Sequence, residues 1–273
     1  STQWVFGGYI RDDNILADST SGGAFSAIVF AYCQGKYAIF GAESTEIYKA
    51  KHVCITDIKH LMRLRGSKYS QSDIANSYRE THHLLKKGVK VLFSGTPCQI
   101  GGLMRYLGNR HYDNLLTVEV ICEGVPSPLF MAKQIDFVNR YHLKSSAITK
   151  MMYRDKDKKR WDYEVMSYIN DEKKYKVDRW FNPFWSIWLQ HLMTRPSCYV
   201  CEYTTKERVA DITLGDLWGV HLYCPDLYND NKGASLIICN TSKGYEVVEK
   251  AKGFMHSREL DLDDALKYQS PMC

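Results

Sequence analysis

The pattern of apolar and polar residues changes about halfway along the chain, and each half predicts a different kind of sheet. In the first half, short apolar runs at residues 4–10, 36–42, 89–93 and 115–121 alternate with longer apolar or amphipathic stretches. Such runs are typical of buried strands. The strand–turn–helix unit that ends at Gly108 requires a crossover connection, so it predicts parallel pairing in part of the sheet.

From Ile148 onward, apolar and polar residues alternate between charged turns, which predicts an antiparallel hairpin or meander. The whole pattern therefore predicts an α/β protein of mixed α+β type, with a partly parallel mixed sheet, flanking helices and the antiparallel stretch as an insertion. A length of 273 residues suits one domain over residues 1–273, which can be divided into lobes of residues 1–145 and 146–273. Helices are predicted at residues 24–32, 57–64, 71–87, 128–141 and 241–252, with a further one after Asn182-Pro183.

Charge and hydropathy exclude several classes of protein. The formal net charge of +5 is small for this length and is not concentrated on one segment, which argues against nucleic acid as a partner. The basic but mixed run at residues 154–160 is interpreted as a solvated hairpin tip, with a docking patch for an acidic partner as the alternative. Since no run of about 18 apolar residues occurs, no membrane span is expected. Residues 1–8 show no secretion signal, so we expect a cytoplasmic protein.

Nine cysteines are the strongest chemical signal in the chain. Without a secretion signal, their number indicates metal binding or redox chemistry rather than a disulfide framework. Four lie at the ends of predicted elements: Cys98 begins a helix, where a thiolate is favoured, Cys122 ends a strand, and Cys198 and Cys201 form a C-x-x-C loop. Four thiolates suit zinc or an iron–sulfur cluster. Because zinc sites usually bring two C-x-x-C pairs, the spacing favours a cluster, and zinc, a redox dithiol or unrelated thiols remain as alternatives.

Two loops have residues that could hold a phosphate or a ring system. Ser21, Gly22 and Gly23 precede a predicted helix, whose exposed N–H groups favour phosphate, although simple helix capping is the commoner reason for such a turn. The loop at residues 65–69 combines a hydroxyl, cations and an aromatic ring, which a surface loop could equally contain.

Six segments in this order resemble the coenzyme F420 hydrogenase/dehydrogenase beta-subunit family, and the resemblance extends from about residue 4 to about residue 250. The segments are residues 19–25, 65–69, 95–99, 122–127, 195–201 and 208–219. The resemblance implies an oxidoreductase with a flavin, FAD rather than FMN, beside a [4Fe–4S] cluster. Electrons would pass between the cluster and a small-molecule substrate or hydride carrier at the flavin, with ferredoxin, a redox partner subunit or an F420-type carrier as partner.

The same resemblance implies a set of site residues. The cluster ligands would be Cys98, Cys122, Cys198 and Cys201. The flavin site would contain Ser21, Gly22, Gly23, Ser67, Lys68, Tyr69, Gly95, Thr96 and Gln99, with Arg208 and Trp218 as weaker candidates. For a catalytic proton donor, the weak candidates are Glu123 and Asp216.

Two features depart from the family pattern. Many members carry a ferredoxin-like run of closely spaced cysteines, C-x-x-C-x-x-C-x-x-x-C, and this sequence has none, so an N-terminal ferredoxin-like domain is expected to be absent. Glu123 stands where relatives often have histidine. Two other functions stay open: a zinc-stabilised, non-catalytic binding module, and an electron-transfer subunit without a substrate of its own.

Overall fold

The computed structural model describes residues 3–144, 147–156 and 161–269. Its largest element is a nine-stranded sheet. The strands are β1 (Trp4–Ile10), β2 (Tyr37–Glu46), β3 (Lys49–Ile55), β4 (Ser72–Asp73), β5 (Lys90–Gly95), β6 (Leu115–Val120), β10 (Ile212–Asp216), β11 (Ser235–Cys239) and β12 (Met255–Glu259). They lie in the order β12-β1-β11-β10-β6-β5-β2-β3-β4.

The centre of this sheet is parallel and its flanks are largely antiparallel. Strands β2, β5, β6 and β10 pair in parallel, whereas β11 is antiparallel to both β10 and β1. The predicted mixed, partly parallel sheet is therefore confirmed. Because of these strand directions, the carboxyl ends of β5, β6 and β10 lie beside the amino end of β11 at one edge of the sheet. In α/β proteins, ligands usually bind at such an edge.

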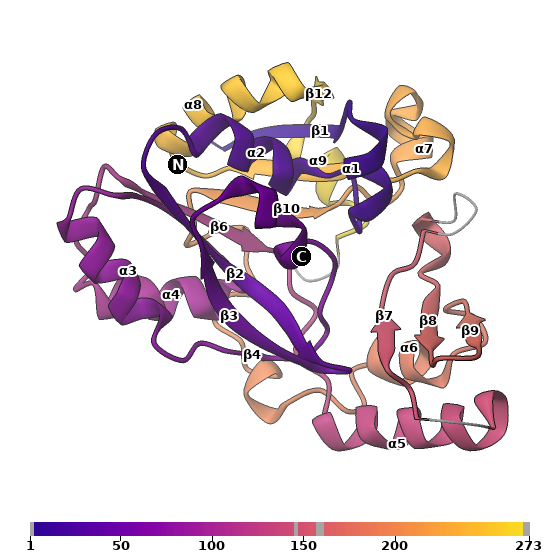
Figure 1. Cartoon of the computed structure of the whole chain (residues 1–273). Helices are drawn as coiled ribbons and strands as arrows, with labels where there is room; N and C mark the ends of the chain where they lie inside the picture. Colours follow the sequence, from indigo (N-terminus) through magenta and orange to yellow (C-terminus); the bar gives the residue numbers. More distant parts are fainter. Residues whose placement is uncertain (1–2, 145–146, 157–160, 270–273) are drawn as a thin grey trace.

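Helices cover both faces of the sheet (Figure 1). On one face lie α2 (Ala24–Tyr32) and α8 (Ser242–Ala251), and on the other lie α3 (Ser77–Lys86) and α4 (Pro97–Tyr106). Because successive strand residues point to opposite faces, Ile39 packs in the core beneath α2 and α8, while Phe40 packs beneath α3 and α4. The short helices are α1 (Asp13–Asp18), α7 (Val220–Tyr223) and α9 (Leu262–Leu266), and 3-10 helices span Ile58–Leu64, Trp161–Tyr163, Pro196–Cys198, Pro225–Leu227, Asn229–Asn231 and Lys252–Phe254.

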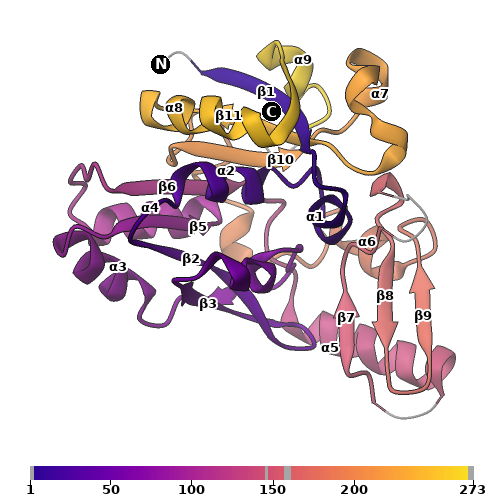
Figure 2. The ribbon, with the colours of Figure 1, turned by 45° about the horizontal axis from the view of Figure 1, so that its top comes forward.

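A separate small lobe contains the predicted antiparallel insertion, which is confirmed (Figure 2). Its sheet has three antiparallel strands, β7 (Lys150–Met152), β8 (Met166–Ile169) and β9 (Lys174–Val177). These strands pack on α5 (Pro128–Val138), which continues as a π-helical turn at Asn139–Leu143, and on α6 (Pro183–Trp188). The lobe has its own aromatic core, in which Phe184, Trp185 and Trp188 are fully buried.

Two local predictions are wrong, and one strand was missed. The helix predicted at residues 71–87 begins only at Ser77, because Ser72–Asp73 pairs with β3 and Ala75 has a positive φ of 46°. Strand β12 was not predicted at all. The run interpreted as a solvated tip turns inward at Arg154 and Asp155, each of which is only 8% exposed, because both side chains find buried partners; residues 157–160 lie outside the described residues. None of the described helices has the length and apolar character needed to cross a bilayer.

Candidate functional site

The four cysteines singled out from the sequence lie on three segments near the edge of the sheet at which β5, β6 and β10 end. Cys98 lies in the first turn of α4 after β5, Cys122 follows β6, and Cys198 and Cys201 belong to the loop around the Pro196–Cys198 helix. Burial raises the pKa of the Cys122 thiol to about 12, and the charges of Cys98, Cys198 and Cys201 raise it as well. Cys122 therefore lies near the other three thiols, although the four cysteines come from three separate segments.

A short antiparallel pairing brings Cys122 and Cys198 together. Pro126 and Thr194 form an isolated β-bridge, the N–H of Ser127 donates to the carbonyl of Met193 (3.0 Å), and the N–H of Arg195 donates to that of Val125 (2.8 Å). The segment after the first cysteine is thereby paired with the segment before the second.

Gly124 is required at the tightest point of this pairing. Its φ is +94°, and a Cβ there would lie 2.6 Å from Cγ2 of Thr194 and 3.4 Å from Cβ of Cys198. The Gly124 N–H also donates to Sγ of Cys122 (3.4 Å). A side chain at this position would therefore separate the two cysteine segments.

The loop that carries Cys201 is fastened to α4 and β6. Gly101 in α4 leaves room for the phenol of Tyr203, whose oxygen occupies the space of a side chain there. The guanidinium of Arg208 donates to the carbonyls of Tyr203 (2.9 Å) and Thr205 (3.0 Å) and forms a fully buried ion pair with Glu119 of β6. Arg208 thus holds the cysteine loop in place, and its role at a cofactor stays a prediction.

The turn between β5 and α4 is held by a buried hydrogen-bonded chain. Oε1 of Gln99 accepts from the N–H of Thr96 (3.0 Å), in a capping box, and a Cβ at Gly95 would lie 3.0 Å from the same Oε1. Nε2 of Gln99 donates to Oγ of Ser72 (2.9 Å). The turn before Cys98 is therefore built by Gly95, Thr96 and Gln99. Their predicted contacts with a flavin stay predictions.

His52 completes this chain. Its Nε2 lies 2.8 Å from the carbonyl of Ser94, which can only accept, so Nε2 carries the hydrogen and Nδ1 accepts from Oγ of Ser72 (2.8 Å). The imidazole is 3% exposed, and burial lowers its pKa, an effect that the hydrogen bond to Ser94 opposes. The sequence offered no signal for His52, because its partners Ser72 and Ser94 come from two other segments.

Replacing His52 by leucine should lower the free energy of unfolding by about 1–3 kcal/mol, because Ser72 loses its acceptor and the Ser94 carbonyl loses a donor. In the wild type, the unfolded chain takes up a proton at His52 below about pH 6.5, before the folded chain does. Stability should therefore fall as the pH drops from 7 to 5, more steeply than in His52→Gln. Urea unfolding across this pH range measures both effects. If the free energy of unfolding depends on pH equally in the wild type and in His52→Gln, the buried neutral imidazole is contradicted.

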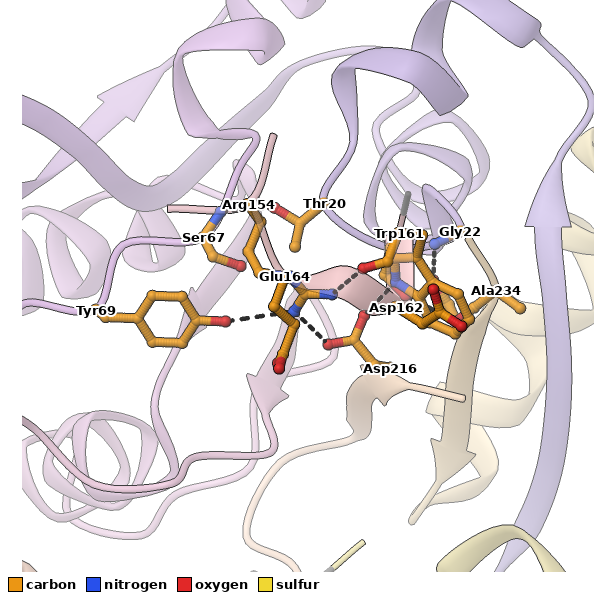
Figure 3. A network of polar contacts seen from close by, with 12 residues as sticks. Thr20, Gly22, Ser67, Tyr69, Arg154, Trp161, Asp162, Glu164, Asp216 and Ala234 are labelled. Carbon is orange, nitrogen blue, oxygen red and sulfur yellow. Dashed lines mark hydrogen bonds and ion pairs between the residues drawn. The ribbon is translucent and has the colours of Figure 1, made fainter. Parts of the chain in front are cut away.

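A second network centres on Arg154, which comes from the insertion (Figure 3). Its side chain is 3% exposed, and Nη1 donates to Oδ2 of Asp216 (2.9 Å) and to the hydroxyl of Tyr69 (3.4 Å). Nε1 of Trp161 donates to Oδ1 of Asp216 (3.0 Å), and the Trp161 ring stacks on Trp218 at 5.1 Å. Both oxygens of Asp216 are therefore engaged, and Trp218 is part of the packing around Arg154.

Carboxylates lie around this guanidinium, and that of Glu164 is buried. Burial raises the pKa of Glu164, and the charges of Asp216 and Glu123 raise it further, whereas Arg154 and Arg179 lower it. Arg179 binds Glu164 at 2.9 Å. Of the two proton-donor candidates, Asp216 thus lies inside the network and Glu123 lies close enough to influence it; both roles stay predictions.

The two predicted loops meet beside this network. Oγ1 of Thr20 accepts from the N–H of Ser67 (2.8 Å), which joins the loop before α2 to the loop after the Ile58–Leu64 helix. Nζ of Lys68 donates to the carbonyls of Leu64 (3.1 Å) and Arg65 (2.8 Å), and burial lowers its pKa to about 8.

Tyr69 packs its ring into the aromatic core of the insertion. The ring lies edge-on to Trp185 and Trp188, with centroids 5.2 Å and 4.7 Å away. Its predicted contact with a flavin stays a prediction.

Close packing accounts for the glycines of the first loop. A Cβ at Gly22 would overlap the carbonyl oxygen of Gly8 and the amide nitrogen of Ser235, and Gly23, the N-cap of α2, has a φ of +79°. Oγ of Ser21 donates to the carbonyl of Ala234 (2.8 Å).

Lys156 of the insertion reaches the same loop. Its Nζ donates to the carbonyls of Leu16 (2.9 Å) and Ser21. Among the described residues, no carboxylate lies within ion-pair distance of this ammonium. The charged run had suggested a surface, so neither Lys156 nor Arg154 was predicted as a site residue.

Both the sequence and the fold of the chain are similar to those of known redox proteins. A family model described as the C terminus of the coenzyme F420 hydrogenase/dehydrogenase beta subunit matches residues 88–263. The structure is similar to a chain of the xenon-derivatised F420-reducing [NiFe] hydrogenase complex from Methanosarcina barkeri, with a TM-score of 0.63 and 19% identity, over 97% of this chain and 88% of that one. At that identity the likeness concerns the fold. No curated protein matches the chain.

Proposed function

The chain belongs to the coenzyme F420 hydrogenase/dehydrogenase beta-subunit family, and we propose that it is an oxidoreductase that transfers electrons between a [4Fe–4S] cluster and a substrate or hydride carrier at a flavin. The family itself indicates electron transfer. The observation that carries the finer proposal is the approach of the four cysteine thiols at the sheet edge where the two predicted cofactor loops also meet.

The donor set supports a cluster rather than a single zinc ion. The four proposed ligands comprise one C-x-x-C pair, Cys198 and Cys201, and two single cysteines, whereas structural zinc sites usually bring two such pairs. A tetrahedral zinc site needs all its ligands around one centre, whereas the four cysteines of a [4Fe–4S] cluster each bind a different iron and stand farther apart. We propose Cys98, Cys122, Cys198 and Cys201 as the ligands of the cluster.

The donor set also supports a phosphate-containing flavin. The ammonium of Lys156 is largely enclosed and forms no ion pair with a carboxylate of the described residues, which favours an anion nearby. The first N–H groups of α2, which follow Ser21, Gly22 and Gly23, add donors of the kind that phosphate prefers. We propose FAD for this position, with Ser67 and Thr96 at its borders.

The chain's own residues then have distinct tasks. A flavin supplies hydride chemistry and a cluster supplies single-electron transfer when they are bound. The hydrogen-bonded chain from His52 to Gln99 fixes the turn between the two proposed sites. Arg154 compensates the charge of Asp216, and the stacked rings of Trp161 and Trp218 shield that pair from water. Ferredoxin or a redox partner subunit is the proposed source or acceptor of electrons.

Metal and cofactor analysis of the full chain, prepared without oxygen, tests this proposal. We expect about four iron and about four sulfide per chain, because each ligand cysteine binds one iron of the cluster, together with one extractable flavin. Zinc without iron would support the alternative of a zinc-stabilised binding module. Iron without flavin, after incubation with FAD, would support an electron-transfer subunit that has no substrate of its own.

A further inference from the structure

The hydroxyl of Thr194 is a buried polar group that has no partner. The residue is 7% exposed, and no hydrogen bond to Oγ1 is present in the described part of the chain. A buried hydroxyl without a partner costs roughly 1–3 kcal/mol, so each one that a native protein keeps calls for an explanation.

Thr194 stands directly against the cysteine segments. Its Cγ2 is the nearest atom to a Cβ built on Gly124, and Cys198 is the next residue that such a Cβ would meet. Gly124 already donates its N–H to Sγ of Cys122. The threonine side chain therefore lies where Cys122 and Cys198 come together, and the acceptors that a cluster brings to this place are thiolate and sulfide sulfurs.

We propose that Thr194 is a positioning residue whose hydroxyl donates a hydrogen bond to a sulfur of the cluster and thereby sets its reduction potential. The inference rests on the proposed function, because the acceptor belongs to the proposed cluster. Reduction adds negative charge to the sulfurs, and a hydrogen bond to them is therefore stronger in the reduced form. The hydroxyl favours reduction and raises the potential.

Thr194→Val tests this proposal, because valine keeps the branched shape and removes only the hydroxyl. In a redox titration of the full chain followed by electron paramagnetic resonance, reduction of the variant should be at least about threefold less favourable, which corresponds to about 30 mV for one electron. Thr194→Ser keeps the donor and should stay near the wild type. Iron content should be unchanged in both variants.

Thr81→Val is the matched control. Thr81 in α3 also has a fully buried hydroxyl without a partner in the described residues, but it belongs to none of the segments that carry the four proposed ligands. The cluster of the Thr81→Val variant should have the same reduction potential as that of the wild type. Equal potentials for Thr194→Val and the wild type would overturn the proposal, as would a loss of iron in both Thr194 variants, because the serine variant keeps the hydroxyl donor. Iron lost from the valine variant but kept by the serine variant supports it. A wild type without a cluster would instead overturn the proposed function.

Discussion

Exchanging Arg154 for methionine should lower the free energy of unfolding by about 3–5 kcal/mol, the range seen when one partner of a buried ion pair is removed. The guanidinium is 3% exposed and binds Asp216 at 2.9 Å. Methionine keeps much of the length but leaves the carboxylates of Asp216 and Glu164 without this cation. Unfolding in urea, followed by tryptophan fluorescence, measures the loss.

A double-mutant cycle separates the charge from the packing. Removing the Asp216 charge as well, in Arg154→Met with Asp216→Asn, should recover part of the lost stability, because the buried carboxylate is no longer unpaired. The exposed pair of Arg258 and Asp226, whose side chains are 64% and 48% exposed, provides the control. Arg258→Met should cost less than about 1 kcal/mol. If Arg154→Met also costs less than about 1 kcal/mol, Arg154 does not lie at the centre of the network.

Cys198→Ala should reduce the iron content from about four atoms per chain to less than about one, because a cluster that loses one of its four cysteine ligands is not retained. Structural metal sites are strongly coupled to the conformation of their loops, so the loop around residues 196–203 should also become more accessible to proteolysis. Iron analysis after anaerobic reconstitution gives the result.

Cys224→Ser is the matched control for this variant. Cys224 is buried, belongs to the core around α7 and donates to Asp226, a bond that a serine hydroxyl can replace. It should keep the full iron content. Full iron in Cys198→Ala would remove Cys198 from the ligand set, whereas loss of iron in both variants would show that general destabilisation, and not ligation, controls the metal.

Hydrophobic patterning was sufficient to predict the central strands, because β1, β5 and β6 are buried on both faces and carry continuous apolar runs. It was not sufficient for the two-residue β4, which exists through pairing with β3 and through the bonds of Ser72 to His52 and Gln99. Such an element depends on partners that are distant in sequence, and no local pattern encodes it.

The cysteines could be predicted as a group from their positions at element ends, but the way they meet could not. The bridge between Pro126 and Thr194 pairs residues that are far apart in sequence, and neither segment reads as a strand. Charge patterning was misleading at Arg154 and Lys156, because a run of mixed charge is usually solvated. Only the tertiary structure shows that this run turns toward Asp216 and Ser21.

Gly22 was interpreted as part of a phosphate-binding turn, whereas close packing against the backbone already requires a glycine there.

An anaerobic reductive titration of the full chain with dithionite tests both proposed cofactors at once, because it counts the electrons that the bound groups accept. We predict about three electrons per chain, since a flavin accepts two and a [4Fe–4S] cluster accepts one. Uptake of about one electron would contradict the flavin, and no uptake by a protein that contains zinc would contradict electron transfer by this chain altogether.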